Sequence, residues 1–410
     1  MSHKRNKSVY VIVLLAVSIL YLNFCAINDL KPGNLYATTR HGSSSPSDRG
    51  DGINPRYVIF CGTRPEIIKV APVIMAMKTS GMNVHVVFTG QHPDIATPFR
   101  KFWDIPFDTI LRGVFQSDQT ISSLVGSLIS IIEKTIPKNS NDIWIVQGDT
   151  SSGLAAGLVA FFRSTPLIHL EAGLRTFDHS SPFPEEVNRH TLSLVASLHV
   201  APSELSEARL LAEGVEPDRV VVYGNTGIDA ARLAEKNIVS PNNVKIQQGN
   251  NRMVFVTMHR RENADRFESF YNAIGGLEVS DVDFVVPVHP NPAATKAAEA
   301  ACAKFSHIQC VPPMGYGETQ WMLKKSMLVL TDSGGLQEEA TWYGRPVLVL
   351  RDATERTEAI NAGSSVLIGN DPVKLKSLLA DLCIPNSKIL KDMSIKSYPF
   401  GGEADEATIL

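Results

Sequence analysis

Cysteine is scarce in this chain, and its spacing matches no common metal site. The 410 residues include five cysteines, with no Cys-x-x-Cys pair and no cysteine–histidine cluster. This pattern argues against a structural zinc site. We expect Cys61, Cys302, Cys310 and Cys383 to be buried thiols, as free cysteine usually is. We therefore predict no bound metal and no disulfide framework.

An excess of charge of one sign is also missing. The formal net charge is −3, and 20% of the residues are charged, so no global charge recruits nucleic acid. The hydrophobic content of 44% is ordinary for a globular protein. A chain of this length exceeds one compact core and suits two domains.

A long apolar run occurs near the N-terminus. Residues 9–27 are almost all apolar, which is long enough to span a bilayer. The preceding basic residues, His3, Lys4, Arg5 and Lys7, are expected to stay in the cytosol. We therefore predict a cytosolic tip and transmembrane signal anchor over 1–29 and a flexible stem over 30–55. The catalytic part would then lie in the Golgi or another secretory lumen. A cleaved signal peptide is the alternative.

Short apolar runs alternate with helical stretches from Tyr57 onward, a pattern typical of parallel sheets with helices on both faces. The sequence predicts strands over Tyr57–Cys61, Val84–Phe88, Ile143–Val146, Leu167–Leu170, Leu198–Val200, Val220–Tyr223, Val254–Thr257, Phe284–Val288, Ile308–Val311, Leu328–Leu330 and Val347–Leu350. We assign them to two doubly wound, Rossmann-like domains, 56–225 and 226–410. These domains are expected to face each other across a central cleft that suits a bulky ligand.

Three acidic segments follow predicted strands closely. They are Gln147–Thr150, His169–Thr176 and Pro184–Arg189. Ligands bind at the carboxyl ends of parallel strands, so Asp149 and Glu171 should converge there. Glu185 and Arg189 lie four residues apart and would share a helix face, where they would pair at least partly.

Two further side chains in these segments can be explained without a role in catalysis. We expect Glu186 to be a solvated partner of the Glu185–Arg189 pair, without a catalytic role. The evidence for Arg175 is balanced between a substrate contact and a structural ion pair.

Glycine-rich turns at two further strand ends indicate a diphosphate site. Ser333, Gly334 and Gly335 open a predicted helix, where free backbone N–H groups can bind phosphate. A tight turn with a simple N-cap is the alternative there. Gly62–Pro65 offers a second anion-binding loop on the opposite domain, and a glutamate further along the second helix can accept from a ribose diol.

Histidines at strand ends are further candidates. His259 follows a predicted strand beside two arginines and can protonate or hydrogen-bond a leaving phosphate. A surface loop in which the arginines pair with Glu262 is the alternative. A structural role suits His289 better, and His92 is a weaker candidate.

Taken together, these segments resemble the non-hydrolysing UDP-N-acetylglucosamine 2-epimerases from about Tyr57 to Gly402. The matching strings are Gly62-Thr63-Arg64-Pro65-Glu66, the three acidic segments, Gly224-Asn225-Thr226, His259-Arg260-Arg261-Glu262, Asp332-Ser333-Gly334-Gly335 and Arg351-Asp352-Ala353-Thr354-Glu355-Arg356. The resemblance implies the GT-B-like fold of many glycosyltransferases and a homodimer. It also implies reversible conversion of UDP-GlcNAc to UDP-ManNAc without a metal or nicotinamide cofactor.

The resemblance also implies roles for individual residues. The matching catalytic positions are Asp149, Glu171, Glu185, Arg189 and His259, and the matching nucleotide contacts are Arg64, Lys69, Ser333, Gly334, Gly335, Glu339 and Arg356. Bacterial members bind a second UDP-GlcNAc beside the active site, and Gln91, His92, Arg260 and His289 fall in the matching segments. The chain's end at Leu410 would leave the C-terminal helix of the second domain shorter than in the family.

Two other functions remain open at this point. One is a Golgi-anchored GT-B glycosyltransferase that uses a UDP-sugar, against which the cluster of Asp149, Glu171 and Glu185 argues. The other is a non-catalytic protein that binds or senses UDP-sugars.

Overall fold

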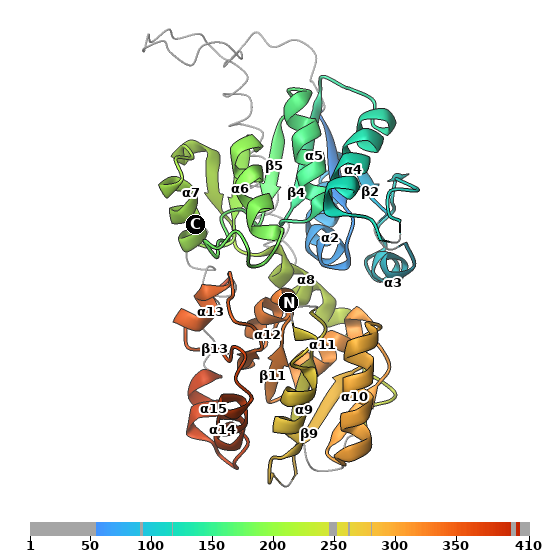
Figure 1. The fold of residues 1–410 in the computed structure, drawn as a ribbon. Helices are drawn as coiled ribbons and strands as arrows, with labels where there is room; N and C mark the ends of the chain where they lie inside the picture. Colours follow the sequence, from blue (N-terminus) through green and yellow to red (C-terminus); the bar gives the residue numbers. More distant parts are fainter. Residues whose placement is uncertain are drawn as a thin grey trace, which may run out of the picture.

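The computed structural model describes residues 55–90, 93–116, 118–245, 252–260, 263–279, 281–394 and 399–401. These residues form two parallel sheets with helices packed on both faces of each (Figure 1). The predicted α/β class with two doubly wound sheets is therefore confirmed.

The first sheet has seven strands in the order β3-β2-β1-β4-β5-β6-β7. They are β1 (Arg56–Cys61), β2 (Asn83–Phe88), β3 (Thr109–Ile110), β4 (Asp142–Gln147), β5 (Leu167–Leu170), β6 (Leu198–Ala201) and β7 (Val220–Val222). In β1, Tyr57 and Ile59 belong to one buried cluster, whereas Val58 and Phe60 belong to the cluster on the opposite face. Burial of both faces explains why such strands are unbroken apolar runs.

The helices of this half of the chain are α2 (Arg64–Thr79), α3 (Pro93–Trp103), α4 (Ile121–Thr135), α5 (Ser151–Phe162), α6 (Glu185–Val195) and α7 (Glu204–Ala212). A short 3-10 helix, η1 (Pro217–Arg219), precedes β7. The start of α2 follows directly from its sequence, because Thr63 and Glu66 form a capping box and Pro65 occupies the first turn. This arrangement satisfies backbone N–H groups that a helix start otherwise leaves free.

The second sheet has six strands in the order β10-β9-β8-β11-β12-β13. They are β8 (Met253–Thr257), β9 (Asp283–Pro287), β10 (Ile308–Val311), β11 (Leu328–Thr331), β12 (Val347–Val349) and β13 (Ser365–Leu367). The helices around them are α9 (Phe267–Gly275), α10 (Pro292–Lys304), α11 (Tyr316–Lys325), α12 (Gly334–Trp342), α13 (Thr357–Asn361), α14 (Pro372–Leu382) and α15 (Lys388–Met393).

The strand order of each sheet reverses at one place. In the first sheet the reversal lies between β1 and β4, and in the second it lies between β8 and β11. Parallel α/β sheets bind ligands in the crevice outside the carboxyl ends of the strands at such a reversal. The loops that follow these four strands are therefore where a site is expected.

Helix α8 (Thr226–Ala234), followed by the 3-10 helix η2 (Glu235–Asn237), lies between the two sheets (Figure 1). It packs against α2 of the first sheet and α12 of the second. The chain returns to this place near its end, because the Asn225 N–H donates to the carbonyl of Phe400 at 2.9 Å. Phe400 is buried beside Ile228 and Ala359. Residues 402–410, on which the predicted shortened helix depends, lie outside the described residues.

The prediction that Cys302 and Cys310 are free thiols is wrong. The two residues form a disulfide that joins the C-terminal turn of α10 to β10, with 5.9 Å between their Cα atoms. That separation lies in the range which a disulfide requires. Consecutive helix and strand bring the two cysteines together across eight positions, and no Cys-x-x-Cys motif indicates this contact. Cys61 and Cys383 are buried free thiols, as predicted.

The predicted anchor and stem lie outside the described residues, apart from Pro55. Within the part of the chain that the structure describes, no helix is both long enough and apolar enough to cross a membrane. The described helix α2, for example, has 16 residues, whereas a span needs about 20. The described structure therefore gives no support to the predicted membrane-spanning protein.

Candidate active site

The loops after β1 and β4 are joined by the side chain of Glu66. One of its carboxylate oxygens accepts from the N–H groups of Gly62 and Thr63 at 3.0 and 2.7 Å. The other accepts from the Thr150 hydroxyl at 2.8 Å. Glu66 is buried and thereby fixes the two loops that border the first strand reversal.

Asp149, in the loop after β4, faces α6. Its carboxylate pairs with the guanidinium of Arg189, and its backbone carbonyl accepts from Asn188 Nδ2 at 2.8 Å. Arg189 also donates through Nε to Glu186 at 3.0 Å. The expected Glu185–Arg189 pair is replaced by these contacts, since Arg189 turns toward Asp149 and Glu186.

The expectation that Glu186 is solvated is also wrong. Its side chain is fully buried, and it accepts from the N–H groups of Thr176 and Phe177 at 3.0 and 2.8 Å. These backbone donors and Arg189 outweigh the effect of burial and hold the pKa of Glu186 below its ordinary value. Glu186 therefore fixes both the loop after β5 and the position of Arg189.

Glu185, at the first turn of α6, has a different environment. Its Oε2 is buried and receives no hydrogen bond from any described residue. Burial and the nearby charge of Asp149 raise the pKa of Glu185, with Arg260 and Arg189 opposing. Such a carboxyl group holds a proton more readily than an exposed one, which suits it to proton transfer.

A charged network links the two sheets around Glu171, which follows β5. Lys69 of α2 pairs with Glu171 and, at 2.8 Å, with Glu338 of α12. Arg356 lies 3.4 Å from Glu171 and 2.7 Å from Glu338. Burial opposes the charge of Lys69, but Glu171 and Glu338 outweigh it and raise the pKa of this lysine. Two buried cations are thus held where the sheets meet.

The start of α12 approaches Arg356 closely. A Cβ atom added at Gly334 would lie 2.7 Å from the Arg356 guanidinium, so only glycine leaves room for this approach. The first backbone N–H groups of a helix have no partner within the helix. The N–H groups of Gly334 and Gly335 therefore lie as backbone donors beside a guanidinium, which is a suitable environment for an anion, whereas the N–H of Ser333 at the N-cap already donates to the Thr331 hydroxyl at 2.9 Å.

Glu339, in the same helix, is buried against α11. It accepts from the side-chain amide of Gln320, and it lies beside Tyr316. Burial raises the pKa of Glu339 to about 7. Arg64 of α2 lies 5.4 Å from the centre of the Phe99 ring, and its charge interacts with Glu339 across the two sheets.

His259, in the loop after β8, pairs with Asp332 at the end of β11. Its Nδ1 lies 3.1 Å from Asp332 Oδ1, and its ring stacks on His289 at 5.0 Å between centroids. Burial and the charges of His259 and Arg64 lower the pKa of His289 to about 4. His289 is therefore neutral near pH 7.

The structure thus brings most of the predicted residues together. Asp149, Glu185 and Arg189 form one group, Lys69, Glu171 and Arg356 form a second, and His259 and His289 form a third. Arg260 interacts with Glu185 through its charge. Gln91 and His92 lie outside the described residues.

Arg175 has a structural role. It donates twice to Glu213, at 2.7 Å each, and is buried. Sequence reasoning missed Glu338 and Glu355, both of which pair with Arg356. The strings that contain them indicated nothing about their partners.

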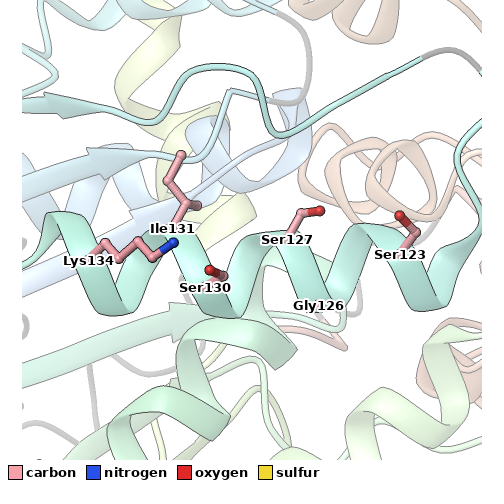
Figure 2. A pocket seen from close by; sticks show the side chains of 6 residues that line it. All are labelled: Ser123, Gly126, Ser127, Ser130, Ile131 and Lys134. Atoms are coloured by element: carbon pink, nitrogen blue, oxygen red, sulfur yellow. The ribbon is translucent and has the colours of Figure 1, made fainter.

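A shallow hollow on the outer surface of α4 differs from this region (Figure 2). It is lined by Ser123, Gly126, Ser127, Ser130, Ile131 and Lys134. The lining contains no carboxylate and a single charged side chain, so it lacks the groups that acid–base chemistry requires. No described group of three or more histidine, cysteine, aspartate or glutamate side chains has the arrangement of a metal site.

Comparison with known proteins gives consistent matches. Residues 75–410 match the family model described as UDP-N-acetylglucosamine 2-epimerase. A probable UDP-N-acetylglucosamine 2-epimerase of Ralstonia solanacearum is 36% identical over 366 residues, covering 86% of this chain and 97% of the relative. The UDP-N-acetylglucosamine 2-epimerase of Bacillus subtilis is 36% identical over 353 residues, covering 85% and 92%.

A solved structure agrees with these matches. The UDP-GlcNAc 2-epimerase of Neisseria meningitidis bound to UDP-GlcNAc superposes with a TM-score of 0.77 at 32% identity, covering 86% of this chain and 98% of that chain. The relatives just described come from bacteria, which have no Golgi. This origin contradicts the predicted localisation in a secretory lumen, which was based on residues 9–27.

Proposed function

The chain belongs to the UDP-N-acetylglucosamine 2-epimerase family, and we propose that it interconverts UDP-GlcNAc and UDP-ManNAc in the crevice between its two sheets. The observation that carries this proposal is the meeting of two features at the strand reversals. Carboxyl groups in unlike environments line the first sheet, and a helix start that suits an anion lines the second.

The reaction needs acid–base groups because the C2 proton of the sugar is not next to a carbonyl. Expulsion of UDP from C1 takes the C1–O electron pair and builds positive charge on the ring. A base then removes the C2 proton, and the C2–H electrons form the C1=C2 double bond of 2-acetamidoglucal. Re-addition of UDP to C1, with protonation of C2 from the opposite face, gives the epimer.

We assign proton transfer at C2 to Asp149 and Glu185. The support is their contrast, because Asp149 is paired with a guanidinium while Glu185 has a raised pKa and an unpartnered buried oxygen among the described residues. A pair of carboxyl groups in unlike environments can act as base and acid in one turnover. Glu171 completes the acidic group, and Arg189 holds Asp149 in place.

We assign the nucleotide to the second sheet and the start of α2. The Ser333 hydroxyl, the backbone donors of Gly334 and Gly335 and the cations of Arg64, Lys69 and Arg356 would bind the diphosphate. Glu339 would accept from the ribose hydroxyls. His259 would hydrogen-bond the diphosphate as it leaves, which stabilises the charge that develops.

The test is a proton NMR time course on UDP-GlcNAc with no acceptor present. We expect UDP-ManNAc to appear until a constant ratio is reached, and UDP-ManNAc as the starting compound should reach the same ratio. A glycosyltransferase would leave UDP-GlcNAc unchanged or release UDP without an epimer. A non-catalytic binding protein would shift the ligand signals and form no product.

Three finer points stay predictions. The first is the homodimer, and the second is the border between the domains at residues 225 and 226. The third is regulation by a second UDP-GlcNAc, bound near Gln91, His92, Arg260 and His289. It would make the rate with UDP-ManNAc alone depend on added traces of UDP-GlcNAc, and a simple hyperbola without that dependence would contradict it.

A further inference from the structure

Asp332 is a buried carboxylate at the end of β11, beside the strand that carries His259. Strands β8 and β11 are paired in register, with Thr257 opposite Thr331. The next residues along each strand therefore emerge at the same edge of the sheet. The side chain of Asp332 is fully buried, whereas the His259 side chain is 28% exposed.

The two oxygens of Asp332 have different partners. Oδ2 accepts from the backbone N–H groups of His259 and Arg260, at 2.9 Å each, and from Asn263 Nδ2 at 3.2 Å. Oδ1 lies 3.1 Å from His259 Nδ1, but no donor among the described residues makes a well-aligned hydrogen bond to it. A buried carboxylate oxygen without a donor is costly, so the arrangement favours a proton on Nδ1.

The contact between Asp332 and His259 Nδ1 determines which ring nitrogen of His259 can face a ligand. Burial alone would raise the pKa of Asp332, but His259 and the two backbone donors outweigh it and hold this pKa below its ordinary value. The carboxylate therefore stays charged and favours a proton on the ring nitrogen that faces it. With Nδ1–H facing Asp332, Nε2 is the ring nitrogen that is left to face a ligand.

The surrounding groups do not compete for this proton. His289 stacks on the His259 ring, and its pKa of about 4 keeps it neutral near pH 7. Among the described residues, the charge of Arg64 acts on His289, and Tyr271 lies near Asp332. Arg64 is a cation, and burial raises the pKa of Tyr271 above its ordinary value, so neither side chain accepts a proton at neutral pH.

We propose that Asp332 is the positioning residue for His259, fixing a proton on Nδ1 and turning Nε2 toward the departing diphosphate. This rests on the proposed role of His259. Asp332 does not touch the substrate. It acts by holding the orientation and the tautomer of the imidazole.

The first test is an NMR titration of the histidine rings in the full chain, with the His259 signals assigned by their loss in His259→Gln. In the wild type, nitrogen shifts at high pH should identify the Nδ1–H tautomer. Asp332→Asn should weaken this preference, so that these shifts move toward those of the Nε2–H tautomer. It should also lower kcat about 10- to 100-fold with little change in KM.

A matched control separates this role from simple anchoring of the loop. Asn263→Ala removes donors to Asp332 Oδ2 and to the Leu350 carbonyl, at 3.2 and 2.9 Å, without changing charge beside His259. It should leave the nitrogen shifts of His259 unchanged. Adding Asp332→Asn to His259→Gln should cost less than about twofold in kcat, because residues that act as a unit are not additive.

The possible failures are distinct. An Nε2–H tautomer in the wild type would overturn the proposal even if Asp332→Asn failed to fold. Unchanged nitrogen shifts of His259 in Asp332→Asn, with equal losses of activity in Asn263→Ala, would overturn it as well. Wild-type turnover by His259→Gln would remove His259 from the proposed function, while the nitrogen shifts would still decide whether Asp332 controls its tautomer.

Discussion

Asp149 and Glu185 are two neighbouring carboxyl groups in unlike environments. Asp149 is 26% exposed and paired with Arg189, whereas burial and the charge of Asp149 raise the pKa of Glu185. The charge of Asp149 therefore favours a proton on Glu185. Two carboxyl groups in unlike environments suit the two roles, base and acid, that epimerisation at one carbon needs.

The first prediction concerns these carboxyl groups. Asp149→Asn and Glu185→Gln should each lower kcat about 10²- to 10⁴-fold, as loss of a general acid or base does. The affinity for UDP, measured by calorimetry, should stay nearly unchanged. Glu299→Gln, on the exposed face of α10, is the control. Near-normal rates in both active-site variants would exclude these residues from proton transfer.

The second prediction concerns Arg64, which we assign to nucleotide binding. Arg64→Ala should weaken UDP binding about 10- to 100-fold, since hydrogen bonds to charged groups contribute roughly 1.5–3 kcal/mol. Calorimetric titration with UDP measures this directly. Arg112→Ala, at an exposed position after β3, should bind UDP like the wild type. Equal affinities in the two variants would argue against a diphosphate contact at Arg64.

At the scale of elements, the loop after β5 approaches α7 closely at Gly173. Gly173 has φ of +88°, and a Cβ atom there would lie 2.3 Å from the backbone carbonyl oxygen of Ser206. Gly214 has nearly the same φ, +89°, but a Cβ there would meet nothing within 4 Å. A comparison of the same substitution at the two glycines therefore distinguishes the effect of backbone strain from that of steric overlap.

The third prediction uses this pair. Gly214→Ala should destabilise the protein by about 1–2 kcal/mol, the cost of the left-handed conformation for a residue with a Cβ. Gly173→Ala should cost clearly more, because a backbone carbonyl cannot move aside as a side chain can. Urea unfolding of both variants measures the difference. Equal losses of stability would show that α7 moves away from the new Cβ atom without a further loss of stability.

Which elements the sequence predicts depends on how they are buried. Central strands such as β4 and β5 are buried on both faces, so they read as apolar runs and could be predicted. The edge strands β3 and β13 have two and three residues, too few to show a pattern, and both were missed. The Cys302–Cys310 disulfide was missed because it depends on how α10 turns into β10.

The residues of the candidate site also divide into those that the sequence could predict and those that it could not. Asp149 and Glu171 could be predicted because the end of a parallel strand is where polar residues meet a ligand. Glu338 could not, since its partners Lys69 and Arg356 lie on distant parts of the chain. Glu186 resembled a surface residue beside Glu185, and its burial follows from the loop that folds over it.

At the scale of the whole molecule, polar contacts join the two sheets and their helices at two places. Lys69 and Arg356 bridge them at Glu338 and Glu171. Further along, the Ser203 hydroxyl donates to Glu358 at 2.5 Å, and Arg209 donates to Thr357 at 2.9 Å. The first sheet thus carries acids and the second carries the helix start, and these contacts hold the two together.

The fourth prediction concerns stability in acid. His169 and His199 lie side by side on β5 and β6, and burial lowers the pKa of His169 to about 4 and that of His199 to about 3. The unfolded chain takes up these protons near pH 6.5. Stability from each histidine is therefore fully present above pH 6.5 and is lost as pH falls toward the folded-state value.

His199→Leu should reduce this loss by roughly 2–3 kcal/mol between pH 6.5 and 4, at about 1.4 kcal/mol for each pH unit. Denaturant unfolding at a series of pH values measures it. His179→Gln, at an exposed position, should keep the wild-type dependence. The same acid sensitivity in His199→Leu would show that His199 is not the group responsible.

Conversion of UDP-GlcNAc in heavy water tests the central claim most directly, because elimination across C1 and C2 exchanges the C2 proton with a solvent-derived one. We predict that UDP-ManNAc formed in D₂O carries deuterium at C2 from the first turnovers. The C2 proton signal should be missing from the product and should fade from the remaining substrate as the reaction reverses. A product that retains protium at C2 would contradict the elimination route and the proton-transfer roles assigned to Asp149 and Glu185.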